Sequence, residues 1–261
     1  MYTQLKESIQ KGNTILFVGA GISASVQLPN WNELIEYLAQ DLGYDPDVFK
    51  EYGNYLALAE YYLQEKTFKN LQKWMKEKWD VAEEKIQNSE LYKTIAQLNF
   101  PIIYTTNYDR CLEKAMNIWK KKYKTIIDVR DIVDLERDTV QIIKFHGDIM
   151  AEDSIVLSES QYFSRLNFDT SLDIKLRADM LGKSILFIGY SLSDINVRLI
   201  LYRLNQLWES SIAEKRPKSY IFLTNQNPIQ EKILKSIGID PIYSKGSDRT
   251  EETVNFLKNL I

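Results

Sequence analysis

The sequence contains one cysteine, Cys111, and one histidine, His146. A single cysteine cannot form a disulfide within the chain, and a structural zinc site needs about four Cys or His ligands. We therefore expect neither a disulfide nor a bound metal. No apolar run approaches the roughly 20 residues of a membrane-spanning helix, and the first residues lack the charged-then-apolar order of a signal peptide. A cytoplasmic location without membrane attachment is the expectation.

The chain also has little excess of either charge. Its 33 Lys and Arg residues and 36 Asp and Glu residues give a formal net charge of −3. The absence of an overall basic surface argues against nucleic acid as a direct ligand. Apolar residues make up 44% and charged residues 26%, which is ordinary for a globular chain with a buried core. The 261 residues fit one large domain, or one domain that carries an insertion.

Hydrophobic periodicity predicts an α/β fold. Short apolar runs predict buried strands at residues 14–18, 101–104, 124–128, 140–144, 155–157, 184–189, 219–224 and 239–243. Apolar residues at helical spacing predict helices at 5–11, 31–42, 55–63, 68–79, 91–98, 108–116, 172–181, 194–208, 229–237 and 251–261. The alternation predicts a Rossmann-like, doubly wound parallel sheet. The pattern predicts a single domain, 1–261. Within it, residues 32–98 are predicted to form an all-helical module inserted between the first and second strands.

A glycine segment, Gly19-Ala20-Gly21-Ile22-Ser23, follows the first predicted strand. A Gly-x-Gly-x-x-Ala pattern between a strand and a helix fits a dinucleotide-binding loop, in which backbone N–H groups approach a pyrophosphate. A nicotinamide dehydrogenase would next show a second strand and an acidic residue about 20 positions further on. The helical region that follows here argues against that class. Glycines that serve only a tight turn stay as an alternative.

Two further segments end predicted strands: Thr105-Thr106-Asn107-Tyr108-Asp109 and Phe145-His146-Gly147-Asp148. Ligands bind at the carboxyl ends of strands in open α/β sheets. These segments supply an amide, carboxylates and the only imidazole of the chain. Asn107 alternatively caps the next helix, and His146 alternatively is structural. A Cys111 nucleophile paired with His146 is formally possible, but a buried structural thiol is the favoured interpretation.

Four phrases occur in order: residues 19–23, Thr106-Asn107-Tyr108-Asp109, His146-Gly147 and Gly189-Tyr190-Ser191-Leu192. They resemble the set that marks the sirtuin superfamily, and more closely the bacterial SIR2-like proteins of anti-phage defence. Sirtuin deacylases carry a four-cysteine zinc module, which this composition excludes. They also have Gly-Ile-Pro-x-Phe-Arg where this chain has Gln27-Leu28-Pro29-Asn30-Trp31. The resemblance therefore implies an NAD⁺-cleaving enzyme rather than a deacylase.

Three catalytic residues are expected. Asn107 would hold a ribose hydroxyl or the attacking water, and His146 would orient or deprotonate a ribose hydroxyl. By resemblance, Asp109 would contact the nicotinamide carboxamide, while Asp148 would orient His146 or be structural. The residues expected to contact NAD⁺ are Gly19, Ala20, Gly21, Ile22, Ser23, Thr106, Gly189, Ser191, Leu192, Asp194 and Asn225.

Several of these assignments have structural alternatives. Ser193 or Asp194 would cap the helix that follows instead of binding the adenosine ribose. Ser247-Asp248 is a weaker candidate for adenine, and Trp31 either stacks near the ligand or packs in the core.

The leading functional hypothesis is an NAD⁺ glycohydrolase that releases nicotinamide and ADP-ribose and exhausts NAD⁺ on infection, with NAD⁺ as substrate and no metal. One alternative is a non-catalytic module that binds NAD⁺ or ADP-ribose, and another is an ADP-ribosyltransferase; deacylation is the least favoured. A constitutively active enzyme of this kind would poison its host. We therefore expect control by homo-oligomerisation or by a separately encoded partner, which in related systems is a HerA-like ATPase or a short argonaute.

Overall fold

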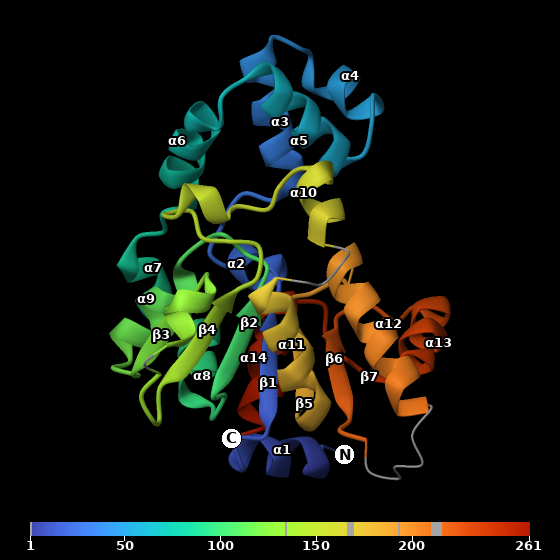
Figure 1. Cartoon of the computed structure of the whole chain (residues 1–261). Coiled ribbons are helices and arrows are strands. Elements are labelled where there is room, and N and C mark those ends of the chain that lie inside the picture. Colours follow the sequence, from blue (N-terminus) through green and yellow to red (C-terminus); the bar gives the residue numbers. More distant parts are fainter. Residues whose placement is uncertain (1, 134, 166–169, 193, 210–215) are drawn as a thin grey trace.

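The computed structural model describes residues 2–133, 135–165, 170–192, 194–209 and 216–261 (Figure 1). Its strands form one sheet in the order β3-β4-β2-β1-β5-β6-β7, and all of the pairings are parallel. Their bounds are β1 Thr14–Val18, β2 Ile102–Thr105, β3 Tyr123–Ile126, β4 Val140–Lys144, β5 Ser184–Ile188, β6 Ser219–Leu223 and β7 Ile239–Tyr243. The predicted doubly wound sheet is confirmed.

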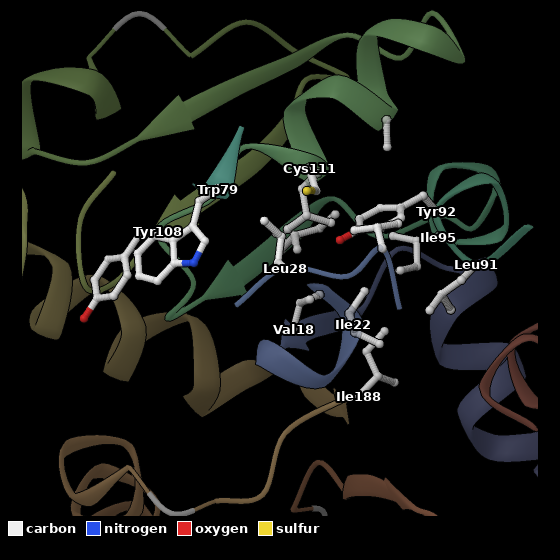
Figure 2. Close-up of a cluster of buried hydrophobic side chains, with 14 of the residues drawn as sticks. Val18, Ile22, Leu28, Trp79, Leu91, Tyr92, Ile95, Tyr108, Cys111 and Ile188 are labelled. Atoms are coloured by element: carbon white, nitrogen blue, oxygen red, sulfur yellow. The ribbon is translucent and has the colours of Figure 1, made fainter. Parts of the chain in front are cut away.

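β1 lies at the centre of the sheet, and its five side chains are all buried. Successive side chains of a strand point to opposite faces, so Leu16 and Val18 enter one core while Ile15 and Phe17 enter the other. Figure 2 shows Val18 in the first core, close to Ile22 and Ile188. The uninterrupted apolar run is therefore explained by helices on both faces of the sheet.

Each face of the sheet is covered by its own set of helices (Figure 1). The first core receives side chains from α1 (Thr3–Gln10), α8 (Glu90–Gln97), α9 (Cys111–Ile118) and α14 (Arg249–Lys258). The second core receives them from α11 (Ser171–Gly182), α12 (Ile195–Glu209) and α13 (Pro228–Ser236).

A run of helices separates β1 from β2 in the chain: α2 (Ala20–Ala24), α3 (Trp31–Leu42), α4 (Pro46–Glu51), α5 (Tyr55–Glu65), α6 (Phe68–Trp79), α7 (Glu83–Gln87) and α8. We call α3–α6 the helical module; it stands beyond the carboxyl ends of the strands (Figure 1). Asn30 starts α3 with a reciprocal capping box to Glu33, and Gly43 ends the helix in a left-handed conformation. In contrast, α8 packs against α9 and α14 beside the sheet.

The strand predicted at 155–157 is wrong. Val156 N–H donates to the carbonyl of His146 at 3.0 Å, and Leu157 N–H donates to Gln161 Oε1 at 2.7 Å. One backbone hydrogen bond does not make a ladder. The run is apolar because Ile155 and Leu157 pack into the core beneath this loop, not because it extends the sheet. The loop then leads into a short helix, α10 (Glu159–Ser164).

The helix predicted to begin near Tyr108 begins at Cys111. Asp109 Oδ1 accepts the backbone N–H of Cys111 at 3.0 Å. Asn107 lies four residues before Cys111, and its side-chain amide donates to Ser23. The alternative in which Asn107 caps α9 is therefore wrong.

The order of the strands reverses beside β1. The chain passes through β2, β3 and β4 on one side of β1 and then returns through β5, β6 and β7 on the other. Loops that diverge at such a point leave room for a ligand at the carboxyl edge. We therefore expect a ligand site among the loops that follow β1, β2, β4 and β5.

Candidate functional site

The loops after β1 and β5 cross in direct backbone contact. Gly19 N–H donates to the carbonyl of Ile188 at 3.0 Å, and Gly21 N–H donates to the carbonyl of Gly189 at 2.9 Å. A Cβ on Gly19 would lie 2.3 Å from the carbonyl oxygen of Gly189, which itself has a φ of +57°. Glycine is thus required for close approach and for backbone conformation. Because both N–H groups are already paired, a pyrophosphate at this loop would have to use other donors.

A short hydrogen-bond relay joins the loop after β1 to the loop after β2. Asn107 Nδ2 donates to Ser23 Oγ at 2.8 Å, and Ser23 Oγ donates to Asp109 Oδ2 at 2.7 Å. Asn107 N–H also donates to Thr105 Oγ1 at 3.0 Å, and that hydroxyl donates to the carbonyl of Val18 at 2.9 Å. The side chain of Asn107 is thus bonded to α2, and its backbone N–H is bonded to the last residue of β2.

The relay fixes which way the Asn107 amide faces. A carboxylate only accepts, so the single proton of Ser23 is directed to Asp109. The oxygen of Ser23 can then only accept, and Asn107 must present its nitrogen. The amide oxygen of this half-buried residue is thus left for a ligand. Asp109 uses one oxygen for Ser23 and the other for Cys111 N–H, so both of its oxygens already have a hydrogen-bond partner.

His146 lies beside Asn107 at the same edge of the sheet. Thr105 of β2 pairs in register with Lys144 of β4, and Asn107 and His146 each follow two residues later. Neighbouring strands are about 4.8 Å apart. Asn107 and His146 therefore both lie just beyond the carboxyl ends of adjacent strands.

The imidazole of His146 is 1% exposed. Its Nδ1 lies 3.1 Å from the hydroxyl of Tyr162, and its Nε2 lies 3.3 Å from Asp194 Oδ2. The second contact is not aligned as a hydrogen bond, since Nε2 has no hydrogen-bond partner among the described residues. Burial lowers the pKa of His146 to about 4, against the opposing influence of Asp194. The ring is therefore neutral at pH 7.

A buried lysine underlies both loops. Lys144 Nζ lies 3.5 Å from Glu113 Oε1 and 3.4 Å from Asp148 Oδ2. It also donates to the carbonyls of Tyr108, at 3.3 Å, and Asp109. Burial acts to lower the pKa of Lys144, but the carboxylates, Glu113 foremost, raise it above the usual value. Through these contacts the charged Lys144 connects the loop that contains Asn107 to the loop that contains His146. Asp148 faces this lysine rather than His146.

The remaining residues expected to contact NAD⁺ lie in the segments that follow β5, β2, β6 and β1. Asp194 Oδ1 accepts the N–H of Val197 at 3.0 Å and caps α12, so its capping alternative is confirmed. Leu192 is buried with a φ of +55° and Ser191 is exposed in the same loop, whereas Ser193 lies outside the described residues. Thr106 follows β2 and is half-buried, and Asn225 follows β6 and is exposed; both lie at the carboxyl edge. In the segment after β1, Ala20 is exposed and Ile22 is in the core.

The weaker candidates are accounted for by packing and capping. Trp31 stacks on Tyr55, with ring centroids 6.0 Å apart, and packs against the first core. Asp248 caps α14 through the N–H groups of Thr250 and Glu251. Cys111 is buried beside Tyr92 (Figure 2).

Sequence reasoning missed Tyr162, Lys144 and Arg165. Lys144 carried a signal, because a charged residue that ends an apolar strand next to a candidate histidine needs a buried partner. Tyr162 and Arg165 carried none, since they follow His146 by 16 and 19 positions in a segment without distinctive composition.

The SIR2-like domain family model matches residues 101–242, and the chain belongs to this family. The NAD(+) hydrolase ThsA of Bacillus cereus (strain MSX-D12) is 31% identical over 208 residues, which cover 78% of this chain and 42% of that protein. ThsA of Enterococcus faecium is 29% identical over 250 residues, 91% of this chain and 47% of that protein. Defense-associated sirtuin 2 of Bacillus subtilis is 27% identical over 88% of this chain and 23% of its own length. This chain thus spans less than half of each of these relatives.

A solved structure of a mutant Sir2 homologue in complex with ADP-ribose superposes with a TM-score of 0.52 at 15% identity, and covers 99% of this chain and 97% of that one. This likeness confirms the sirtuin-like Rossmann fold. No helix in the described part of the chain has the length and apolar character needed to cross a bilayer.

Proposed function

We propose that this chain is an NAD⁺ glycohydrolase, which cleaves the bond between nicotinamide and ribose to give nicotinamide and ADP-ribose. The observation that carries the proposal is the fixed amide of Asn107, whose oxygen is left for a ligand next to the neutral imidazole of His146. Relatives named NAD(+) hydrolase, at 29–31% identity, support it.

The residues suit this chemistry without a strong acid. Nicotinamide leaves NAD⁺ as a neutral molecule, and the transition state resembles an oxocarbenium ion, so the site must hold the ribose and position a water. Asn107 Oδ1 accepts a hydrogen bond from that water and orients it, and the water loses its proton to solvent once it has added to the ribose; His146 accepts a hydrogen bond from a ribose hydroxyl. Asp109 acts through Ser23 on Asn107.

Access to His146 requires a local movement. Tyr162 and Asp194 contact the two nitrogens of the ring, which is 1% exposed. In our proposal the ribose displaces Asp194 from Nε2, and Thr106, Gly189, Ser191, Leu192 and Asn225 contact the rest of the dinucleotide.

We extend the proposal to anti-phage defence, in which cleavage depletes cellular NAD⁺ and is switched on by oligomerisation or by a separate partner. The similarity to a protein named defense-associated sirtuin 2 supports this role.

The test is to incubate the purified chain with NAD⁺, alone and with candidate partners, and to resolve the products by chromatography. Equal amounts of nicotinamide and ADP-ribose are expected. Asn107→Ala and His146→Ala should each reduce turnover at least about 100-fold. Asn99→Ala is the matched control, because that amide bonds to the carbonyl of Gln10, far from the carboxyl edge.

Three outcomes contradict parts of the proposal. Wild-type turnover in both Asn107→Ala and His146→Ala removes these residues from the reaction. Nucleotide binding without products indicates a regulatory module. Transfer of adenine-labelled ADP-ribose to protein or nucleic acid indicates a transferase.

A further inference from the structure

The hydroxyl of Tyr162 sits between the imidazole and the carboxylate. It lies 3.1 Å from His146 Nδ1 and 3.4 Å from Asp194 Oδ2. Burial raises the pKa of Tyr162 far above neutrality, and His146 is neutral at pH 7. One phenolic proton and one imidazole proton are therefore shared among Tyr162, His146 and Asp194.

Two arrangements of these protons are possible. If Tyr162 donates to Nδ1, the imidazole proton is on Nε2, where it is buried and no described group is aligned to accept it. If Tyr162 donates to Asp194, the imidazole proton is on Nδ1 and donates to the phenolic oxygen. The second arrangement pairs both donors. An unpaired buried N–H is costly and rare in folded proteins, so the second arrangement is favoured.

The rest of the structure holds Tyr162 in this position from both ends of α10. At the start of α10, Ser160 donates its N–H and its hydroxyl to Glu60 of the helical module, at 3.0 and 2.7 Å. Just after α10, Arg165 donates to the carbonyl of Phe145 and, at 2.6 Å, to Asp173. Phe145 directly precedes His146, so the tyrosine and the histidine are anchored to the same piece of backbone.

We propose that Tyr162 is a positioning residue that fixes His146 in the Nδ1–H tautomer and leaves Nε2 as the nitrogen that receives a ribose hydroxyl. Other charged groups face the ring: Asp194 at the start of α12, Arg165 after α10 and Asp173 of α11. None of them contacts Nδ1 in the described residues, and Asp194, 3.3 Å from Nε2, is not aligned to accept its hydrogen; the hydrogen bond of Tyr162 is the aligned contact that selects the tautomer. The consequence for catalysis rests on the proposed function, but the tautomer itself does not.

The single histidine makes a direct test feasible. Histidine labelled with ¹⁵N gives one imidazole spectrum, and two-bond ¹H–¹⁵N correlations at pH 7 distinguish protonated from unprotonated nitrogens. For the wild-type chain we expect Nδ1 protonated and Nε2 unprotonated. Tyr162→Phe should shift the tautomer ratio toward Nε2–H by about tenfold, the size expected for one hydrogen bond. In a matching assay with NAD⁺, Tyr162→Phe should lower kcat and leave KM within about twofold.

Tyr104→Phe is the matched control. It removes another buried phenol that donates to a carboxylate, Asp179 at 2.8 Å, and it should leave the imidazole spectrum unchanged. A wild-type spectrum with Nε2 protonated overturns the proposal, as does an unchanged ratio in Tyr162→Phe. Because the spectrum needs no NAD⁺, it decides the tautomer even if the chain does not cleave NAD⁺.

Discussion

Glu60 and Ser160 are 100 residues apart in the sequence and form a two-point contact between the helical module and α10. The carboxylate of Glu60 accepts the backbone N–H of Ser160 at 3.0 Å and its hydroxyl at 2.7 Å. In Figure 1, α10 lies between α5 and the sheet. Two residues after Ser160, Tyr162 contacts His146. The inserted helices are therefore connected to the candidate site through one short helix.

The Glu60 contact predicts a component of stability that depends on pH. Hydrogen bonds from the hydroxyls of Ser160 and then Ser158 lower the pKa of Glu60 to about 2 from 4.5. A depressed carboxyl pKa stabilises the fold above the unfolded value and loses that contribution as pH falls from about 4.5 to about 2. Glu60→Gln should remove this component. Since Glu60 is only half-buried, its size should be under about 1 kcal/mol.

Thermal denaturation of wild type and Glu60→Gln, compared between pH 2 and pH 6, measures the difference. Glu65→Gln, an exposed residue of the same helix, is the control. Parallel pH profiles for wild type and Glu60→Gln would contradict the prediction.

Removal of the buried charge of Lys144 should destabilise the fold strongly. Lys144→Met leaves buried Glu113 and Asp148 with Arg110, at 4.0 and 3.8 Å, as their remaining cation, and breaking a buried ion pair typically costs about 3–5 kcal/mol. Lys114→Met removes a lysine that pairs with the exposed carboxylate of Asp80, and should cost under about 1 kcal/mol. Urea denaturation of both variants measures the difference. Similar losses would show that Lys144 is not a buried link between the two loops.

Gly189 should not tolerate a side chain. A Cβ there would lie 2.6 Å from Ile22 N, and the backbone is already at a φ of +57°. We expect Gly189→Ala to lower the free energy of unfolding by about 2–4 kcal/mol. Gly43 also has a positive φ, +85°, but nothing within 4 Å, so Gly43→Ala should cost only about 1 kcal/mol of backbone strain. Chemical denaturation compares them, and equal costs would rule out the close contact as the cause.

Cys111 should be unreactive in the folded chain. Burial, followed by the nearby charge of Asp109, raises the pKa of its thiol well above the usual value, and thiolates are the reactive form. A thiol reagent at pH 8 should modify the native chain far more slowly than the chain in denaturant. Rapid modification of the native chain would reopen the interpretation of Cys111 as a nucleophile.

The sheet and the pair Asn107 and His146 were predictable for the same reason. Buried parallel strands are continuous apolar runs, so β1 and β5 are visible in the sequence, and polar residues just after such runs mark the carboxyl edge. The strand predicted at 155–157 failed because a short apolar run packed beneath a loop looks the same in the sequence as a buried strand. The alternative in which Asn107 caps the next helix does not hold, because Asp109, two residues later, accepts the N–H of Cys111 at the start of α9.

The contacts that refine the site were not predictable in this way. Tyr162 meets His146 only because Glu60 and Arg165 hold α10 in place, and both interactions depend on tertiary structure. Likewise, the orientation of the Asn107 amide depends on Ser23, 84 residues earlier in the chain.

The crossing of Gly19 and Gly189 makes the first loop rigid before any ligand arrives. Its backbone is held by hydrogen bonds to the neighbouring loop. The two loops are so close that the methyl group of an alanine would not fit between them. Little conformational entropy is left there for a bound molecule to remove, so association is less opposed than at a disordered loop. Any adjustment of the site to ligands of different shape must then come from the other loops at the carboxyl edge of the sheet.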